Sequence, residues 1–473
     1  MTELSKNSIV SLVGGETATI IKELGRGGQG IVYLVEVCGE KKALKWYLNA
    51  PDDKFYRNLA QNIASRAPSD AFLWPEYLTE KQQGSYGYIM KLRPQNYYEF
   101  GNFLLAKVSF KSFTAMLSAA MKICDGFMML HRFGYSYQDL NDGNFFIDPQ
   151  TGDVLICDND NVMPQGEKSG IMGKARYMAP EIVAGGIPNK YSDRFSLSVI
   201  LFMLFYANHP FEGAKVVACP CMTEAFEKKF YGSEALFIYD PTDKSNLPVR
   251  GIHQNVIRRW PVFPQMLRDA FIEEFSKEKL QDPSTRMIEQ NWKKIISSVR
   301  DSLVVCQHCA EETFVNVSDS TDKCMNCGKD VDLSKRLVIN NRSLPLTQNT
   351  YIYIDEDNTP DGVVTTDSNG FMLIKNISTE TWTVETPSGK IKTVAPNEIL
   401  PVKEGLKITF RVHTVPYKAE IKFMSNNYSS MIVTSSLLPI WINPPGAESN
   451  SLKALSGKLS HVVKSQSCIA FMN

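Results

Sequence analysis

The sequence has no surplus of either charge. Lys plus Arg and Asp plus Glu number 51 each among 473 residues, so the formal net charge is zero. A strongly basic chain would indicate nucleic acid or an acidic membrane surface as its main partner, and this composition excludes that as a general property. We therefore expect neither nucleic acid nor a membrane as a partner.

The chain also lacks long apolar runs and a recognisable secretion signal. Its longest apolar stretch, Leu197 to Ala207, is far shorter than the roughly 20 apolar residues that cross a bilayer, and it reads as a buried core helix. The opening residues, MTELSKNSIVSLVGGE, do not combine a charged start, an apolar run and a small-residue cleavage site. We expect a cytoplasmic protein in a reducing compartment.

Cysteine is not abundant, but four of the ten cysteines form two C-x-x-C pairs. Without a secretion signal, such pairs predict a metal site rather than a disulfide framework. Two knuckles with two thiolates each complete a closed tetrahedral site, so we predict a structural Zn²⁺ in a ribbon at 301–334. The predicted ligands are Cys306, Cys309, Cys324 and Cys327. Cys219 and Cys221 have no second pair nearby in sequence and are interpreted as ordinary thiols.

Hydrophobic residues make up 43% of the chain, enough for a sizeable core. At roughly 100–200 residues per domain, this length predicts two to four domains. Apolar–polar alternation favours strands in 9–47, a β-rich pattern returns in 335–424, and 136–180 is irregular. Residues 425–473 have no assignment. Helical patterns occupy 51–66, 110–131, 192–207 and 264–300.

A glycine-rich segment, ELGRGGQGIVYLVE, carries Gly25, Gly27 and Gly30 in G-x-G-x-x-G spacing. Without Cβ atoms, backbone N–H groups can approach phosphate oxygens. A strand pattern follows the motif, whereas a dinucleotide-binding fold would begin a helix there. This context favours a hairpin that lies over phosphates, and Lys45 on the next strand pattern can reach the α and β phosphates.

Two acidic segments carry the chemistry. In SYQDLNDGNFF, Asp139 and Asn144 have the spacing of a phosphotransferase catalytic loop, where the aspartate accepts the hydroxyl proton and the asparagine holds magnesium. Asp158 ends the short strand VLIC and is the second predicted magnesium ligand. These residue types together suit an in-line attack on a metal-neutralised γ-phosphate.

With these motifs, residues 18–300 resemble the eukaryotic-like protein kinases. GKARYMAPE, SDRFSLSVILF and DPSTR add to the resemblance, which implies that Glu181 pairs with Arg286 and that Asp193 holds the catalytic loop. It also implies a bilobal α+β fold, with an N-lobe at 1–92 and a C-lobe at 93–300. The implied cofactors are ATP and Mg²⁺, and the implied acceptor is a serine or threonine of a protein.

The resemblance assigns roles to individual residues. Asp139 is the catalytic base, Lys45 positions the phosphates, and Asn144 and Asp158 bind Mg²⁺. The residues that we expect around ATP are Leu24, Gly25, Arg26, Gly27, Gly28, Gln29, Gly30, Ile31, Val32, Ala43, Lys45 and Phe146. Wording such as ICDNDNV and HPFEG is closer still to a bacterial subgroup encoded beside a von Willebrand A protein and a metal-dependent protein phosphatase, which implies those two proteins as partners.

The sequence departs from the family at several positions. Tyr137 and Gln138 stand where His and Arg precede the catalytic aspartate, so loop phosphorylation, for which only Ser169 is available, loses its usual receiver. The helix after Lys45 carries no acid, and we expect Gln61 or Asn58 to orient that lysine. Asn141 replaces a common lysine two positions after Asp139. These changes keep a nucleotide-binding pseudokinase scaffold as an alternative, and a small-molecule kinase as a third reading.

Residues 335–424 weakly resemble forkhead-associated domains, through an N-x-S turn and a closing G-x-x-I-x-F strand. The resemblance implies a small antiparallel β-sandwich. The stretch IDEDNTPDGVVTTDSNG lacks the Arg and His that bind phosphothreonine in that family. A general protein-binding β-sandwich therefore stays open beside a phosphopeptide-binding domain.

Overall fold

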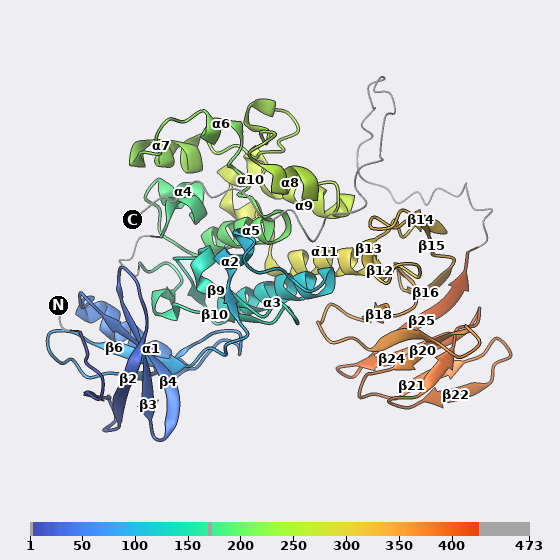
Figure 1. Ribbon diagram of the computed structural model, residues 1–473, viewed down its shortest axis with the longest axis horizontal. Coiled ribbons are helices and arrows are strands. Elements are labelled where there is room, and N and C mark those ends of the chain that lie inside the picture. Colours follow the sequence, from blue (N-terminus) through green and yellow to red (C-terminus); the bar gives the residue numbers. More distant parts are fainter. Residues whose placement is uncertain (1–2, 169–172, 425–473) are drawn as a thin grey trace. The chain divides into compact units, whose positions relative to one another are not determined.

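The computed structural model describes residues 3–168 and 173–424, which divide into two units between Arg300 and Asp301 (Figure 1). Each unit is described by itself. Ser169 and the unassigned segment 425–473 lie outside the described residues.

Unit 1 begins with a six-stranded antiparallel sheet of order β1-β2-β3-β4-β6-β5, with helix α1 packed on one face (Figure 1). Strand β3 alternates between two cores: Ile31 and Tyr33 pack on one face, and Val32 packs with Ala43, Phe55 and Leu59 on the face that α1 covers. The elements are β1 (Ile9–Ser11), β2 (Thr17–Arg26), β3 (Gly30–Val37), β4 (Glu40–Tyr47), α1 (Asp53–Ser65), β5 (Pro75–Leu78) and β6 (Gly87–Lys91).

The rest of unit 1 is mainly helical. Its helices are α2 (Phe100–Leu104), α3 (Phe113–Arg132), α4 (Pro180–Val183), α5 (Lys190–Tyr206), α6 (Ala214–Val217), α7 (Glu224–Lys228), α8 (Gln254–Arg259), α9 (Gln265–Glu274), α10 (Lys277–Gln281) and α11 (Glu289–Asp301). Two small sheets lie among these helices. One has the strand order β10-β9-β7, and the other pairs β11 with β8. The strands are β7 (Tyr98–Glu99), β8 (Tyr135–Ser136), β9 (Phe145–Ile147), β10 (Val154–Ile156) and β11 (Met163–Pro164).

Two helical regions refine the sequence expectations. Helix α5 is buried along almost its whole length, as expected for the apolar run at 197–207. The predicted helix at 264–300 is interrupted: Ser276 caps the start of α10, and Pro283, which has no N–H to continue a helix, follows its end. By length and composition alone, helix α3 is apolar enough to span a membrane. However, 61% of its most apolar 18-residue stretch is buried within the protein, as in a core helix.

Unit 2 starts with two β-hairpins, β12 (Leu303–Val305) with β13 (Glu312–Phe314) and β14 (Thr321–Lys323) with β15 (Asp330–Asp332). Two sheets of order β17-β16-β25-β24-β21-β22 and β18-β19-β20-β23 follow, and the side chains buried between them form one core, so this part is an antiparallel β-sandwich. Its strands are β16 (Lys335–Ile339), β17 (Arg342–Pro345), β18 (Tyr351–Ile352), β19 (Gly362–Thr366), β20 (Met372–Asn376), β21 (Trp382–Glu385), β22 (Ile391–Val394), β23 (Ile399–Pro401), β24 (Lys407–Val412) and β25 (Val415–Phe423).

The strand expected over TYIYI is shorter than the pattern predicts. Only Tyr351 and Ile352 pair, because the Ile354 N–H donates to the Asp361 carboxylate at 2.9 Å instead of to a strand. The two predicted modules of unit 2 are also joined, since the Val305 N–H donates to Thr350 Oγ1 at 2.9 Å.

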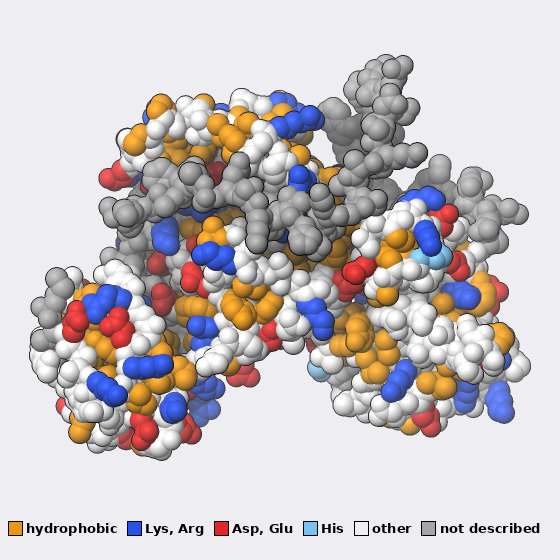
Figure 2. All heavy atoms as spheres, in the orientation of Figure 1, with side chains coloured by type: hydrophobic (Ala, Val, Ile, Leu, Met, Phe, Trp, Pro, Cys, Tyr) orange, Lys and Arg blue, Asp and Glu red, His pale blue; other side chains and the backbone are white. Residues whose placement is uncertain are grey.

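Charged side chains are mixed over the surface. On the face drawn in Figure 2, Lys and Arg alternate with Asp and Glu over the described residues, and neither sign gathers into one continuous patch. This distribution agrees with the balanced composition of the sequence.

Candidate active site

The glycine segment forms the turn between β2 and β3. The Gly27 N–H donates to the Gly30 carbonyl oxygen at 2.9 Å, which closes the hairpin. At Gly30, an added Cβ would lie 2.3 Å from the Trp46 carbonyl oxygen, so glycine is needed for the approach of β4. Lys45 lies opposite Val32 in the β3–β4 register and is 5% exposed. The hairpin and the buried lysine are therefore neighbours, as the sequence predicts.

The partner of Lys45 comes from an unexpected place. Its ammonium lies 2.9 Å from an Asp160 carboxylate oxygen and 3.5 Å from Asp158. The Tyr47 hydroxyl donates to the same Asp160 oxygen at 2.6 Å. Burial lowers the pKa of Lys45, but Asp160 and Asp158 outweigh that effect and raise it above its usual value. The lysine is thus held as a cation by two carboxylates that follow β10.

The expectation that Asn58 or Gln61 orients Lys45 is wrong. Gln61 is exposed, and the Asn58 side-chain amide donates to the Val162 carbonyl oxygen at 2.9 Å, where Asn62 also donates at 3.0 Å. Apolar residues of α1 face the lysine strand instead, among them Phe55, whose ring packs edge-on against Tyr47. Sequence reasoning missed Asp160 because the order D-N-D gives no sign of which carboxylate turns inward.

The catalytic loop places Asp139 beside two asparagines. The Asn141 side-chain amide donates to the Asp139 carboxylate at 3.3 Å and to its carbonyl oxygen at 3.2 Å. The Asn144 amide donates to the Asp139 carbonyl oxygen at 3.1 Å and to the Tyr137 hydroxyl at 3.0 Å. Burial raises the pKa of Asp139, the bond from Asn141 opposes that shift, and the charge of Asp158 adds to it. The pKa of Asp139 is therefore raised above its usual value.

Oxygen atoms of the kind that bind a divalent cation lie near Asp139. Because the Asn144 amide nitrogen makes both of the bonds above, its amide oxygen is left for a cation, and no described residue donates to it. Asp158 has the left-handed backbone φ of 56°, and its side chain remains 41% exposed. Carboxylate and amide oxygens are the ligands that Mg²⁺ takes in proteins. Asn144 and Asp158 therefore fit the predicted metal.

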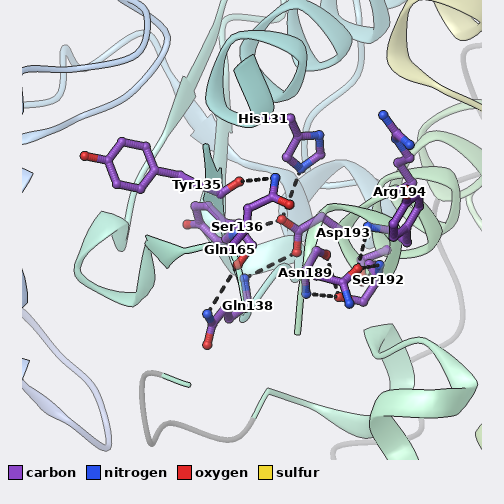
Figure 3. A network of polar contacts seen from close by, with 12 residues as sticks. His131, Tyr135, Ser136, Gln138, Gln165, Asn189, Ser192, Asp193 and Arg194 are labelled. Atoms are coloured by element: carbon purple, nitrogen blue, oxygen red, sulfur yellow. Dashed lines mark hydrogen bonds and ion pairs between the residues drawn. The ribbon is translucent and has the colours of Figure 1, made fainter. Parts of the chain in front are cut away.

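A buried network fixes the backbone of the catalytic loop (Figure 3). The Asp193 carboxylate accepts the N–H groups of Tyr137 at 2.7 Å and Gln138 at 3.4 Å, and lies 3.1 Å from His131 Nε2. The expected role of Asp193 is therefore confirmed.

Gln138 replaces the arginine of related loops. Its side-chain amide donates to the Glu167 carbonyl oxygen at 2.6 Å, so it contacts the backbone of the following segment rather than offering a charge to a phosphate. Farther along, Arg286 makes two bonds of 2.7 Å to the Glu181 carboxylate, and the expected pair is confirmed.

The residues expected around ATP do not all face one way. Val32, Ala43 and Phe146 share one apolar cluster with Met90, next to Lys45. Ile31 packs on the other face of the sheet, so its side chain points away from this cluster. Leu24 is 45% exposed, and the Arg26 guanidinium is paired with Glu3 and Glu23. Of the residues expected around ATP, Val32, Ala43 and Phe146 are therefore the ones whose side chains gather in one cluster.

Unit 2 brings the four predicted zinc ligands together. Their sulfur atoms all lie within 4.8 Å of one another, with Cys306–Cys327 at 3.8 Å and Cys309–Cys324 at 3.7 Å. Tetrahedral coordination with Zn–S bonds of about 2.3 Å implies sulfur separations of about 3.8 Å. The cluster can therefore hold a four-coordinate metal ion. Neither Cys219 nor Cys221 belongs to a potential metal group among the described residues.

Comparison with known proteins agrees with this geometry. Residues 18–221 match the family model described as protein kinase domain. Mouse protein kinase C delta type is 28% identical over 211 residues, which cover 42% of this chain and 30% of that protein. A probable serine/threonine-protein kinase PknB of Bifidobacterium longum is 30% identical over 95 residues, which cover 19% of this chain and 14% of that protein. The chain thus spans less than a third of the length of these relatives. Unit 1 carries a protein kinase domain.

Proposed function

We propose that this chain is an ATP- and Mg²⁺-dependent protein kinase that phosphorylates serine or threonine of a protein substrate. One observation carries the proposal: Lys45, on the strand paired with the glycine hairpin, lies 3.5 Å from Asp158, and the charges of Asp158 and Lys45 both act on the Asp139 carboxylate. The kinase-domain match over 18–221 and the serine/threonine kinase among the relatives support it.

The residues divide the work as follows. Lys45 binds phosphate oxygens, and the N–H groups of the glycine turn lie above them. Bound Mg²⁺, held by Asn144 and Asp158, would neutralise phosphate charge. Asp139 accepts the proton of the acceptor hydroxyl while that oxygen forms a bond to the γ-phosphorus. The bond from the γ-phosphorus to the bridging oxygen breaks, and ADP leaves with its electron pair.

The test is label transfer from γ-labelled ATP with Mg²⁺ and a generic protein substrate. We expect transfer by the wild type and loss of transfer in Asp139→Asn and Asp158→Asn. Asp70→Asn, an exposed carboxylate of the same unit, is the matched control and should retain activity. If no label is transferred while Mg–ATP binding is intact, the chain is a nucleotide-binding scaffold and not an enzyme.

We also propose roles for unit 2. The sulfur cluster suits a structural Zn²⁺, and the β-sandwich suits a protein-binding module of forkhead-associated type. Ligand atoms of Asp355, Asp357 and His413 lie within 4.8 Å of one another. These carboxylates would repel a phosphate, which argues for a partner without phosphothreonine. A von Willebrand A protein and a cognate phosphatase are the proposed partners, and the cytoplasm is the proposed location.

A further inference from the structure

The catalytic loop supplies no cation beside its base. Asn141 stands two residues after Asp139, and its side chain is used for local structure. Its oxygen accepts the Gly143 N–H at 3.0 Å, and its nitrogen donates to Asp139. Lys45, which we assign to the phosphate oxygens, pairs with Asp160 and Asp158 rather than with Asp139. The phosphoryl group in transfer carries negative charge on three oxygens, and a second cation near Asp139 would stabilise that charge.

The chain returns to Asp139 at Gly173. An added Cβ at Gly173 would lie 3.4 Å from an Asp139 carboxylate oxygen and 3.2 Å from the Gln138 carbonyl oxygen. The backbone therefore passes directly against the catalytic loop at this point. The next residue is Lys174, whose ammonium lies 3.5 Å from the Asn141 side-chain oxygen.

The surroundings of Lys174 are anionic. Burial raises the pKa of both Asp139 and Asp158, and the charge of Lys174 opposes that shift at each of them. Within residues 3–168 and 173–424, the ammonium makes no close ion pair, and its bond to Asn141 is long. The lysine is therefore near both functional carboxylates and still able to bind an anion.

The position of Lys174 is fixed by the residues after it. A 3₁₀ turn, Ala175–Tyr177, follows at once. The Arg176 guanidinium donates twice to the Glu212 carboxylate, at 2.5 and 2.9 Å, and Ser196 Oγ donates to the Tyr177 carbonyl oxygen at 2.6 Å. The backbone that carries Lys174 is thus anchored to α5 and to the loop that follows it.

We propose that Lys174 is a catalytic residue that binds the γ-phosphate and supplies the cation that the catalytic loop lacks. The inference rests on the proposed function and deepens it. Lys174 holds the γ-phosphoryl oxygens beside Asp139 while the acceptor oxygen bonds to phosphorus and the bridging bond to ADP breaks. Its positive charge stabilises the negative charge on the oxygens of the phosphoryl group during transfer, and the lysine neither gains nor loses a proton.

The test compares nucleotides with and without a γ-phosphate. Calorimetric titrations with Mg²⁺ use the β,γ-imido analogue of ATP or ADP, on the full chain. We expect Lys174→Met to weaken binding of the analogue about 10-fold or more and to leave ADP binding unchanged. Lys174→Arg should keep most of the preference for the β,γ-imido analogue over ADP. Lys168→Met is the matched control, because Lys168 belongs to the same segment and contacts only the Gly185 carbonyl oxygen among the described residues.

Label transfer provides the second readout. Lys174→Met should lower kcat about 100-fold, the usual cost of one charge-stabilising donor, with the melting temperature close to that of the wild type. Equal effects on the analogue and ADP, or an equal effect of Lys168→Met, would overturn the role of Lys174. If the wild type transfers no label, the proposed function fails, and the nucleotide preference alone still decides whether Lys174 binds the γ-phosphate.

Discussion

At the scale of single residues, the main feature of this protein is the carboxylate that holds Lys45. Asp160 is fully buried, and its neighbour Asn159 is fixed by donating to the carbonyl oxygens of Leu73 and Ile156. The lysine partner therefore lies on the same segment as Asp158, the proposed metal ligand, and not on α1.

Replacement of Asp160 tests this arrangement. We expect Asp160→Asn to lower kcat/KM by roughly 10–100-fold, because a charged hydrogen bond worth about 1.5–3 kcal/mol is lost while Asp158 still attracts the lysine. Steady-state label transfer measures the effect, and circular dichroism checks the fold. Gln61→Ala should match the wild type. If Gln61→Ala lowers kcat/KM more than Asp160→Asn does, the residue that orients Lys45 lies on α1.

At the scale of elements, a buried ionic network joins three helices of unit 1. His131 at the end of α3 lies 2.8 Å from Glu289 of α11 and 3.1 Å from Asp193 of α5. Arg194 donates to the same Glu289 carboxylate at 2.9 Å. Since Asp193 also holds the catalytic loop (Figure 3), the ionisation of His131 links helix packing to the site.

The contribution of His131 to the free energy of unfolding should fall as the pH rises. Burial lowers the pKa of His131, but Asp193 and Glu289 outweigh it and raise the pKa above 6.5. The contribution is therefore complete below about pH 6.5 and lost as pH rises through the folded-state pKa. We expect the loss of melting temperature in His131→Gln to be largest near pH 6 and to shrink toward pH 9.

His209 gives a control of opposite sign. Burial lowers its pKa from 6.5 to about 4, so its contribution is complete above pH 6.5 and lost as pH falls toward 4. The cost of His209→Gln should therefore grow with pH over that range. Parallel pH profiles for the two variants would contradict the assigned ionisation states.

At the scale of the whole molecule, the chain is two units with separate cores. The sandwich core of unit 2 is built from its own strands, and the hairpins that carry the cysteines bury few apolar side chains besides the thiols. A module with so little core would gain much of its folding free energy from a bound metal. We therefore expect the sulfur cluster to stabilise residues 303–332 and to take no part in the chemistry of unit 1.

Zinc content tests this division. We expect one Zn²⁺ per chain by atomic absorption and none in the double variant Cys306→Ser, Cys324→Ser, with faster proteolysis between 303 and 332. Label transfer by unit 1 should persist. The double variant Cys219→Ser, Cys221→Ser is the matched control and should keep one Zn²⁺. Loss of zinc in that control would place the metal elsewhere.

Short-range patterns determined much of this protein in advance. Glycine spacing, the order of Lys45, Asp139, Asn144 and Asp158, and the two C-x-x-C pairs each depend on a few neighbouring residues, so the sequence alone predicts the hairpin, the catalytic loop and the sulfur cluster. Alternation of apolar and polar residues likewise predicts both β regions, and the apolar run at 197–207 predicts the core helix α5. Strand length was less predictable, because the Asp361 carboxylate accepts the Ile354 N–H, a contact that no local sequence pattern displays.

Tertiary structure alone decided which charges meet. Asp160 and Lys45 are joined at 2.9 Å, and Lys174 reaches Asn141 at 3.5 Å, across long stretches of chain. In sequence, Asp160 is one of three polar residues in a turn, and Lys174 is an ordinary exposed lysine. Only packing fixes which carboxylate is buried, because burying a charge is costly unless an opposite charge is brought to it by the fold.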